Sequence, residues 1–320
     1  FKQKTAYEML RSLVGSEMCI RDRYYLNQIK IFDAWDSTFN DSAVVIGIVD
    51  TGIDLFHEDL EDKIWNNKGE MGIDGNGNDK SKNGIDDDGN GFVDDWRGWD
   101  FVSSSSQVGD NDPSPGHQHG THLAGIAAAM TNNVKGIAGI SKGAKLLPVK
   151  VSSDNPLSTT VQNSYEGILY AALMGADIIN CSWGSESRSE SEEEIVRRAT
   201  DLGSLIVSAA GNDGKETKFF PASYKDVLSV LAVNWDDKKA GFSNYDFTVD
   251  VAAPGVDIFS TVPNDNYTVM DGTSMASPVV AGIAAIAKSI HPEYNPLQLK
   301  EFIKSSSDNI DSLNLSLIHI

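Results

Sequence analysis

The chain has 320 residues and a formal net charge of −20, and its sequence pI is near 4.5. This excess of carboxylates argues against nucleic acid or an anionic membrane surface as a partner, and it suits cation binding and solubility in a salty or extracellular setting. Its two cysteines, Cys19 and Cys181, are too few for a disulfide framework, and no apolar run is long enough to span a bilayer.

The two ends of the chain do not resemble protein sequence. Residues 12–23 show neither helical nor strand periodicity. When the chain is back-translated, codons can be chosen for residues 18–22 that are the reverse complement of codons for residues 315–320 over their overlap. Both back-translated segments match a transposase adaptor used in sequencing libraries. We interpret residues 12–23 and 315–320 as translated adaptor and residues 1–11 as joined artificially. The alternative is a degenerate propeptide remnant and a natural tail.

Between these ends, a single large domain is expected over residues 24–314. Apolar runs rich in β-branched residues predict buried strands, and helical patterns alternate with them. The predicted strands are 43–49, 146–151, 178–181, 205–210 and 227–233. This alternation predicts an α/β fold with a doubly wound, mainly parallel sheet flanked by helices in three layers.

The first predicted strand ends in Asp50, Thr51 and Gly52. The carboxyl end of a parallel strand is where open α/β sheets place their chemistry, so Asp50 is a candidate catalytic residue. The alternative is an aspartate that caps a turn or helix.

An acidic, Gly- and Asn-rich insertion occupies residues 74–95. Oxygen donors alternate within it as in the first half of a calcium loop, namely Asp86, Asp88, Asn90, the carbonyl of Phe92, and Asp94. The bidentate Glu of an EF-hand is absent. We predict calcium here, because so many clustered carboxylates are costly without a cation; the alternative is a flexible acidic loop.

Three histidines lie close together where a small-residue helix begins, at His117, His119 and His122. No acidic or cysteine partner stands at metal-ligand spacing beside them, and neither an HExxH nor a Cys/His framework is present. A general base is therefore favoured over zinc, and His119 is the candidate.

Ser274 stands just before a helical pattern over residues 279–289. A helix N-terminus stabilises negative charge that develops beside it, although an isolated serine there is more often a cap. The strand at 205–210 leads into Gly211 and Asn212, a further polar group at the end of a buried strand.

Taken together, the motifs VDTGID (49–54), HGTHLAG (119–125), AAGN (209–212) and GTSMASP (272–278) make the chain resemble the subtilisin-like serine proteases (subtilases, peptidase family S8). The resemblance covers about residues 24–314, which would be the catalytic domain. It implies a triad of Asp50, His119 and Ser274, with Asn212 and the backbone N–H of Ser274 binding the oxyanion.

The resemblance also implies how substrate is held. Ser182, Trp183 and Gly184 would pair with an extended polypeptide and form one wall of the specificity pocket. The opposite wall would consist of Ala209, Ala210 and Gly211.

A second calcium loop over residues 132–137 follows from the same resemblance, with Asn133 and Asp59 among its ligands. Also implied are an extracellular or cell-envelope location and an inhibitory prodomain upstream, lost from this chain.

The predicted function is that of a secreted, calcium-stabilised serine endopeptidase that acts through an acyl-enzyme. The alternative is a non-catalytic calcium-binding adhesion or scaffold domain on the same fold. A dinucleotide-binding enzyme or an α/β-hydrolase is disfavoured, because neither GxGxxG nor GxSxG spacing is present at these sites.

Overall fold

The computed structural model describes residues 23–37, 44–103, 109–310 and 315–317. The helices are α3 Tyr24–Gln28, α4 Ile31–Ser37, α5 His119–Ala128, α6 Ser164–Leu173, α7 Glu190–Asp201, α8 Thr273–Ile290 and α9 Pro296–Ser306, with short 3₁₀ turns at Glu61–Lys63 and Lys80–Lys82. The strands are β1 Val45–Asp50, β2 Trp99–Asp100, β3 Lys145–Lys150, β4 Ile178–Cys181, β5 Leu205–Ala209, β6 Leu228–Val233, β7 Val251–Pro254, β8 Ile258–Val262, β9 Asn266–Met270, β10 Asp308–Ile310 and β11 Leu315–Leu317.

The main sheet has nine strands among the described residues, in the order β10-β11-β7-β6-β5-β4-β1-β3-β2. Its neighbouring strands are parallel except for β10 and β11, which are antiparallel. Strands β8 and β9 form a separate antiparallel pair. The predicted doubly wound, mainly parallel sheet is confirmed, and each of the predicted strands is present with its ends shifted by at most two residues.

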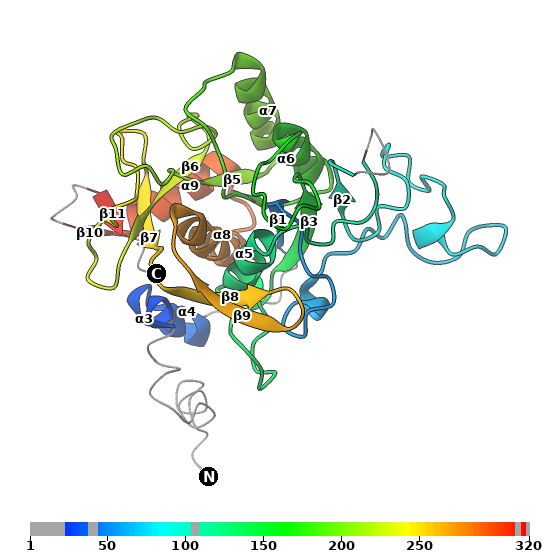
Figure 1. Cartoon of the computed structure of the whole chain (residues 1–320), viewed down its shortest axis with the longest axis horizontal. Coiled ribbons are helices and arrows are strands. Elements are labelled where there is room, and N and C mark those ends of the chain that lie inside the picture. The colour runs from blue at the N-terminus through cyan, green and yellow to red at the C-terminus, as the bar shows by residue number, and fades with distance from the viewer. Residues whose placement is uncertain (1–22, 38–43, 104–108, 311–314, 318–320) are drawn as a thin grey trace, which may run out of the picture.

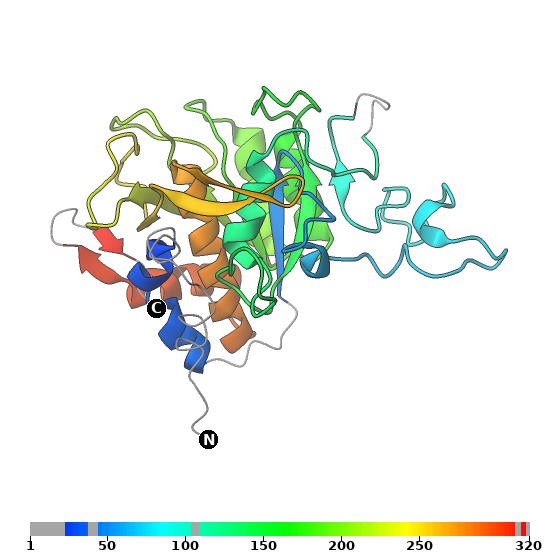
Figure 2. The same ribbon diagram turned by 60° about the horizontal axis from the view of Figure 1, so that its bottom comes forward.

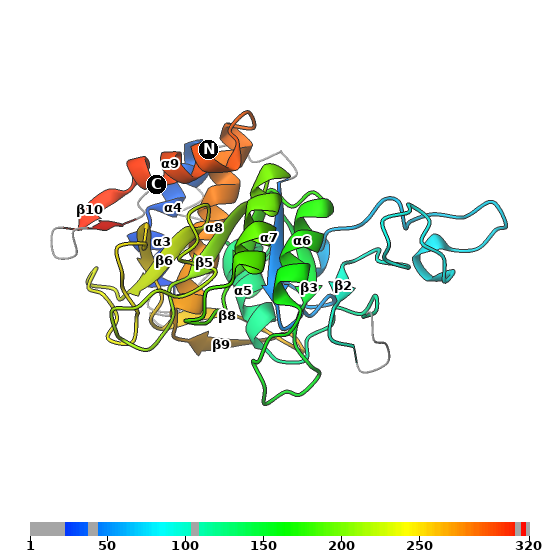
Figure 3. The same cartoon turned by 90° about the horizontal axis from the view of Figure 1, so that it is seen from above.

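Helices cover both faces of the sheet (Figure 1). Helices α5 and α8 pack together on one face, and α6 and α7 pack together on the other, as the view from above shows (Figure 3). Two buried apolar clusters fill the spaces between these layers, with Ile46 and Ile48 of β1 in one and Val49 in the other. This alternation along β1 is why its sequence is apolar on both faces.

Strand β1 is the point where the strand order reverses, because it pairs with β3 on one side and with β4 on the other. Loops diverge at the carboxyl end of such a strand and leave a crevice there. Asp50 is the last residue of β1 and therefore stands at the crevice.

Small residues let α8 lie close to its neighbours. A Cβ on Gly282 would come within 2.5 Å of the Cβ of Ile140 and 2.9 Å of the carbonyl oxygen of Ala127. Within the described ranges, α8 is the one helix long and apolar enough to cross a membrane, although the sequence suggested that no such run exists. It is 83% buried inside the protein, so its apolar surface belongs to the core.

The acidic insertion, residues 74–95, extends away from the body of the molecule in the two side views (cyan in Figures 1 and 2). At the opposite edge of the sheet, β11 pairs with β7. Residues 1–22 and 318–320 lie outside the described residues, and the interpretation of both ends as adaptor stays a prediction.

Candidate active site

Asp50 and His119 meet at the carboxyl end of β1. The imidazole Nδ1 of His119 donates a hydrogen bond of 2.7 Å to Oδ1 of Asp50. Asp50 is 1% exposed, and the same oxygen accepts the backbone N–H of Thr51 at 2.8 Å. Burial lowers the pKa of His119, but the charge of Asp50 and the hydrogen bond outweigh it, so this pKa lies above its ordinary value of 6.5. Because Nδ1 of His119 is bound to Asp50, Nε2 is the second nitrogen of this imidazole, on the opposite side of the ring.

Thr51 ties the end of β1 to the start of α5. Its hydroxyl accepts the N–H of Gly120 at 2.9 Å and donates to the carbonyl of His117 at 2.9 Å. A residue at position 120 must approach β1 closely, since a Cβ there would lie 2.3 Å from the carbonyl oxygen of Gly52. Only glycine allows this approach, which sets the position of His119.

Ser274 lies in the first turn of α8 and faces the end of β4. Its Oγ donates to the carbonyl of Ser182 at 3.1 Å, while Oγ of Ser182 donates to the carbonyl of Ser274 at 2.9 Å. Asn180 reinforces this contact from inside, with Nδ2 donating to Ser182 and Oδ1 accepting from Ser277. In the described part of the chain no hydrogen bond joins Ser274 to His119, although both line one cleft.

Asn212 is held by the residue that precedes Ser274. Its Oδ1 accepts two hydrogen bonds of 2.9 Å from Thr273, one from the backbone N–H and one from the hydroxyl. The hydroxyl of Thr273 in turn accepts the N–H of Gly211 at 3.2 Å. Because its carbonyl oxygen is occupied, the side chain of Asn212 presents its Nδ2 donors to the cleft.

The cleft has a volume of about 970 Å³. The residues predicted to act on or bind substrate line it, except Ala210, which is buried nearby: Asp50, His119, Ser274, Asn212, Ser182, Trp183, Gly184, Ala209 and Gly211. The ring of Phe219 lies against both predicted walls, within 3.2 Å of where a Cβ would stand on Gly184 or Gly211. The walls are thus joined through an aromatic ring at the cleft.

The neighbouring histidines are bound elsewhere. His122 donates through Nε2 to the carbonyl of Thr268 at 3.1 Å, and burial lowers its pKa to about 4. Nδ1 of His117 accepts the backbone N–H of His119 at 3.1 Å. Both hydrogen bonds leave His119 as the histidine aimed at Asp50.

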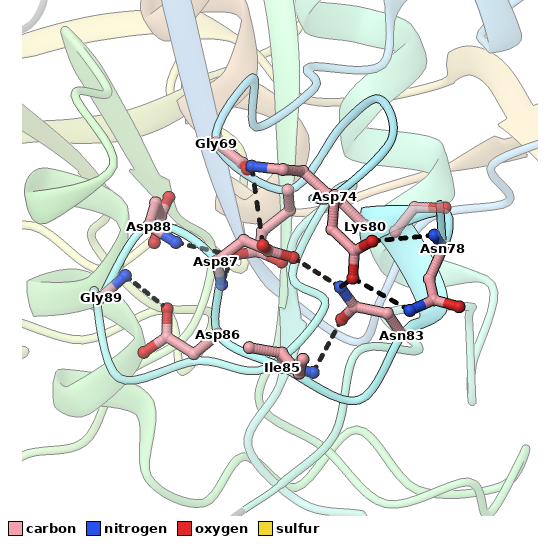
Figure 4. A network of polar contacts seen from close by, with 12 residues as sticks. Gly69, Asp74, Asn78, Lys80, Asn83, Ile85, Asp86, Asp87, Asp88 and Gly89 are labelled. Carbon is pink, nitrogen blue, oxygen red and sulfur yellow. Dashed lines mark hydrogen bonds and ion pairs between the residues drawn. The ribbon is translucent and has the colours of Figure 1, made fainter. Parts of the chain in front are cut away.

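Carboxylates of the predicted calcium half-loop accept hydrogen bonds from the backbone of the insertion. The carboxylate of Asp86 accepts the backbone N–H groups of Gly89, Asn90 and Gly91, and that of Asp94 accepts the N–H of Gly84. Figure 4 shows the bond from Gly89 to Asp86, and also the carboxylate of Asp74, which accepts a hydrogen bond from the side-chain amide of Asn78.

The remaining members of the half-loop face the body of the protein. Asp88 and Asn90 contact Asn67 and Asp95, and the ring of Phe92 packs against Tyr170 with centroids 4.7 Å apart. Glu70 carried no sequence signal, because it lies outside the acidic run 74–95, and Asp95 is the last residue of that run but was not among the predicted ligands.

The second predicted calcium loop does bring its residues together. Asp59 is fully buried, and its carboxylate accepts the amide of Asn133, the N–H of Ile137 at 2.9 Å and the hydroxyl of Tyr267 at 3.0 Å.

Thr51 and Thr273 were not among the site residues predicted from the sequence. Thr51 forms hydrogen bonds with the residues on either side of the start of α5, and Thr273 forms hydrogen bonds with Asn212. Both stand directly beside a predicted catalytic residue in the motifs VDTGID and GTSMASP. Their position next to Asp50 and Ser274 in these motifs is the sequence signal that could have identified both threonines.

Comparison with known proteins finds enzymes among the relatives of this chain. The sequence model of the subtilase family matches residues 41–317. The chain is 40% identical over 277 residues to the thermophilic serine proteinase of Bacillus sp. (strain AK1), which covers 87% of the chain and 59% of that relative. It is 38% identical over 267 residues to thermitase of Thermoactinomyces vulgaris, which covers 83% of the chain and 82% of that relative.

A solved structure of proteases from Pseudoalteromonas arctica PAMC 21717 superposes with a TM-score of 0.74 at 26% identity, over 93% of this chain and 92% of that one. The chain spans less than two thirds of the length of several relatives, the Bacillus proteinase among them.

Proposed function

The chain belongs to the subtilase family of serine endopeptidases, and from this we propose that it cleaves polypeptides through a triad of Asp50, His119 and Ser274. The observation that carries the proposal is the 2.7 Å hydrogen bond between His119 Nδ1 and Asp50 Oδ1, beside Ser274 in one cleft. A serine hydroxyl is a weak nucleophile at its own pKa, and an oriented imidazole is what activates it.

The reaction begins by exchanging one hydrogen bond of Ser274 for another. At rest its Oγ donates to the carbonyl of Ser182; on substrate binding it donates to Nε2 of His119 instead. Oγ attacks the scissile carbonyl carbon while His119 takes its proton, and the imidazolium then protonates the leaving amine. Asp50 keeps the imidazole in the required tautomer and stabilises the imidazolium. Water hydrolyses the acyl-enzyme by the same route.

Asn212 and the backbone N–H of Ser274 stabilise the oxyanion. The occupied Oδ1 of Asn212 supports this role, because it orients the amide so that Nδ2 is the group offered to the cleft. The N-terminus of α8 adds the positive end of its dipole at the same place.

Substrate binds as an extended chain between Ser182–Gly184 and Ala209–Gly211, through main-chain hydrogen bonds. All of these residues except Ala210 line the cleft, which supports this binding mode. Such pairing tolerates many sequences, as a broad endopeptidase requires.

Calcium stabilises the fold in this proposal and takes no part in the chemistry. Asp59 and Asn133 would hold one ion, and Asp86, Asp88, Asn90, Phe92 and Asp94 another, through the oxygen donors that calcium prefers. The complete burial of the Asp59 carboxylate supports the first of these sites. An extracellular or cell-envelope location and an upstream inhibitory prodomain belong to the same proposal.

Replacing the nucleophile tests the proposal. Ser274→Ala is expected to abolish casein hydrolysis and covalent labelling by a fluorophosphonate, while circular dichroism and melting temperature stay unchanged. The control is Ser289→Ala at the other end of α8, which should keep both activities. Labelling that persists in Ser274→Ala would refute the triad.

A non-catalytic adhesion or scaffold domain on this fold is not favoured, because such a domain has no need of the oriented Asp50–His119 pair. It would be indicated by wild-type protein that binds calcium but neither reacts with the fluorophosphonate nor cleaves casein.

A further inference from the structure

We propose that Phe219 restricts the substrate residue on the amino side of the scissile bond, the P1 residue, to a small side chain such as that of alanine. The inference rests on the proposed function and names the substrate class of the same site. Phe219 lines the cleft, and its ring reaches both proposed walls. It would act through its size and take no part in making or breaking bonds.

The P1 side chain must enter the cleft between the two proposed walls. In the proposed mechanism the scissile carbonyl carbon lies at Oγ of Ser274, and its oxygen points toward Asn212. One wall begins at Ser182, whose carbonyl accepts Ser274 Oγ at 3.1 Å. The other wall ends at Gly211, directly before Asn212. Because the P1 Cα is bonded to the scissile carbonyl carbon, its side chain begins within reach of both walls.

The ring of Phe219 closes the space between these walls. A Cβ built on Gly184 would lie 2.6 Å from Cε1 of the ring and 2.8 Å from Cδ1. A Cβ built on Gly211 would lie 3.0 Å from Cγ and 3.2 Å from the same Cδ1. One edge of the ring therefore contacts a glycine of each wall. A P1 methyl group can lie above this edge, whereas a long or aromatic P1 side chain would need the volume that the ring occupies.

Hydrogen bonds fix the backbone that carries the ring. The N–H of Phe219 donates to Oγ of Ser223 at 3.0 Å, and its carbonyl accepts the N–H of Ser223 at 2.8 Å. Oγ of Ser223 shares a further hydrogen bond of 2.9 Å with Thr248. The next residue, Phe220, exchanges two backbone hydrogen bonds with Ser185, of 2.7 and 2.9 Å. The ring thus cannot withdraw from the cleft by a simple shift of its backbone.

The adjacent Phe220 shows how the two aromatic residues differ. Phe220 is 6% exposed, and its ring packs against Tyr224 with centroids 4.8 Å apart. Phe219 is half-buried and lies at the cleft. Neighbouring side chains of an extended segment point to opposite sides, so one ring of the pair belongs to the core and the other faces the walls.

Peptide anilides that differ only in the P1 residue, which is Ala, Leu or Phe, test the proposal. Steady-state kinetics gives kcat/KM for the wild type, for Phe219→Ala and for the control Phe247→Ala. Phe219→Ala removes the ring from between the walls. Phe247 is also aromatic, but it is 82% exposed and lines a separate pocket beside Lys300. The melting temperature of each variant shows whether it is folded.

Wild-type protein should cleave after Ala at least about tenfold more efficiently than after Phe, since even one extra methylene in a closed pocket changes kcat/KM by about 10–200-fold. In Phe219→Ala the preference should reverse, because the opened space buries the larger apolar side chain. Phe247→Ala should keep the wild-type ratio. If Phe219→Ala fails to fold, the smaller change Phe219→Leu must still raise the Phe-to-Ala ratio.

The proposal would be overturned by wild-type protein that cleaves after Phe as well as after Ala, or by a folded Phe219→Ala variant with the wild-type ratio. Failure of the proposed function looks different, because the wild type then cleaves none of the anilides and does not react with the fluorophosphonate. Binding decides in that case. Calorimetry on Ser274→Ala protein should give a lower Kd for a tetrapeptide ending in Ala than for one ending in Phe, and an equal or reversed order would overturn the role of Phe219.

Discussion

Thr273 determines which side-chain atom of Asn212 faces the cleft. By occupying Oδ1 through both its N–H and its hydroxyl, it prevents the amide from flipping and turning an acceptor toward the oxyanion. The same hydroxyl satisfies the N–H of Gly211. One side chain thus orients the proposed oxyanion donor and also contacts a proposed wall of the cleft.

We therefore expect Thr273→Val to lower kcat by about tenfold or more with little change in KM, because the oxyanion exists only in the transition state. Thr273→Ser keeps the hydroxyl and should restore most of kcat. Steady-state kinetics on a peptide ester or anilide measures both constants. An equal rise in KM, or a Thr273→Ser variant as slow as Thr273→Val, would contradict the orienting role.

At the scale of elements, α8 connects the proposed nucleophile, Ser274, to the hydrophobic core. It begins at Thr273 and Ser274 and ends at Ile290, and small residues along it let α5 and the sheet approach. The position of Ser274 therefore depends on packing about two turns away, where Gly282 meets Ile140 and the carbonyl of Ala127.

Gly282→Ala should destabilise the protein by about 1–3 kcal/mol, because the new methyl group overpacks this contact. Helix propensity alone predicts the opposite, a gain of about 0.5–1 kcal/mol. Gly241→Ala is the control, since a Cβ there meets no atom within 4 Å. Urea unfolding of both variants in the Ser274→Ala background measures the difference. If Gly282→Ala is as stable as its parent, the α5–α8 contact can shift to accept the methyl group with no loss of unfolding free energy.

At the scale of the whole molecule, a net charge of −20 on 320 residues acts against the compact state. The described ion pairs are mostly at the surface and screened, so they do little to offset this repulsion. Salt shortens the range of repulsion to about 10 Å at 0.1 M and less above it.

Sodium chloride should therefore raise the melting temperature of calcium-saturated protein by a few degrees between low and high ionic strength. Choline chloride should act equally if screening is the cause. Differential scanning calorimetry in the Ser274→Ala background measures the shift. A melting temperature that is flat or falls with salt would rule out self-repulsion as a major term.

The site residues that could be predicted from the sequence are those at which the local pattern of hydrophobic residues begins or ends. Asp50, His119, Asn212 and Ser274 each stand at the boundary of a buried strand or a small-residue helix, and parallel strands bring such boundaries to one edge of a sheet. The predicted strands are present for the same reason, because burial on both faces leaves a continuous apolar run.

The linear order of residues was therefore enough to predict the family, the sheet and the residues that the family resemblance assigns to the site. Packing in three dimensions was needed to learn that Ser274 rests on Ser182, that Thr273 orients Asn212, and that the ring of Phe219 contacts both walls of the cleft. Periodicity reports which face of one element is buried. It carries no information on the distance between side chains of different segments, or on how far packing removes a carboxylate from water, and these two quantities define a hydrogen-bond partner or a cation site.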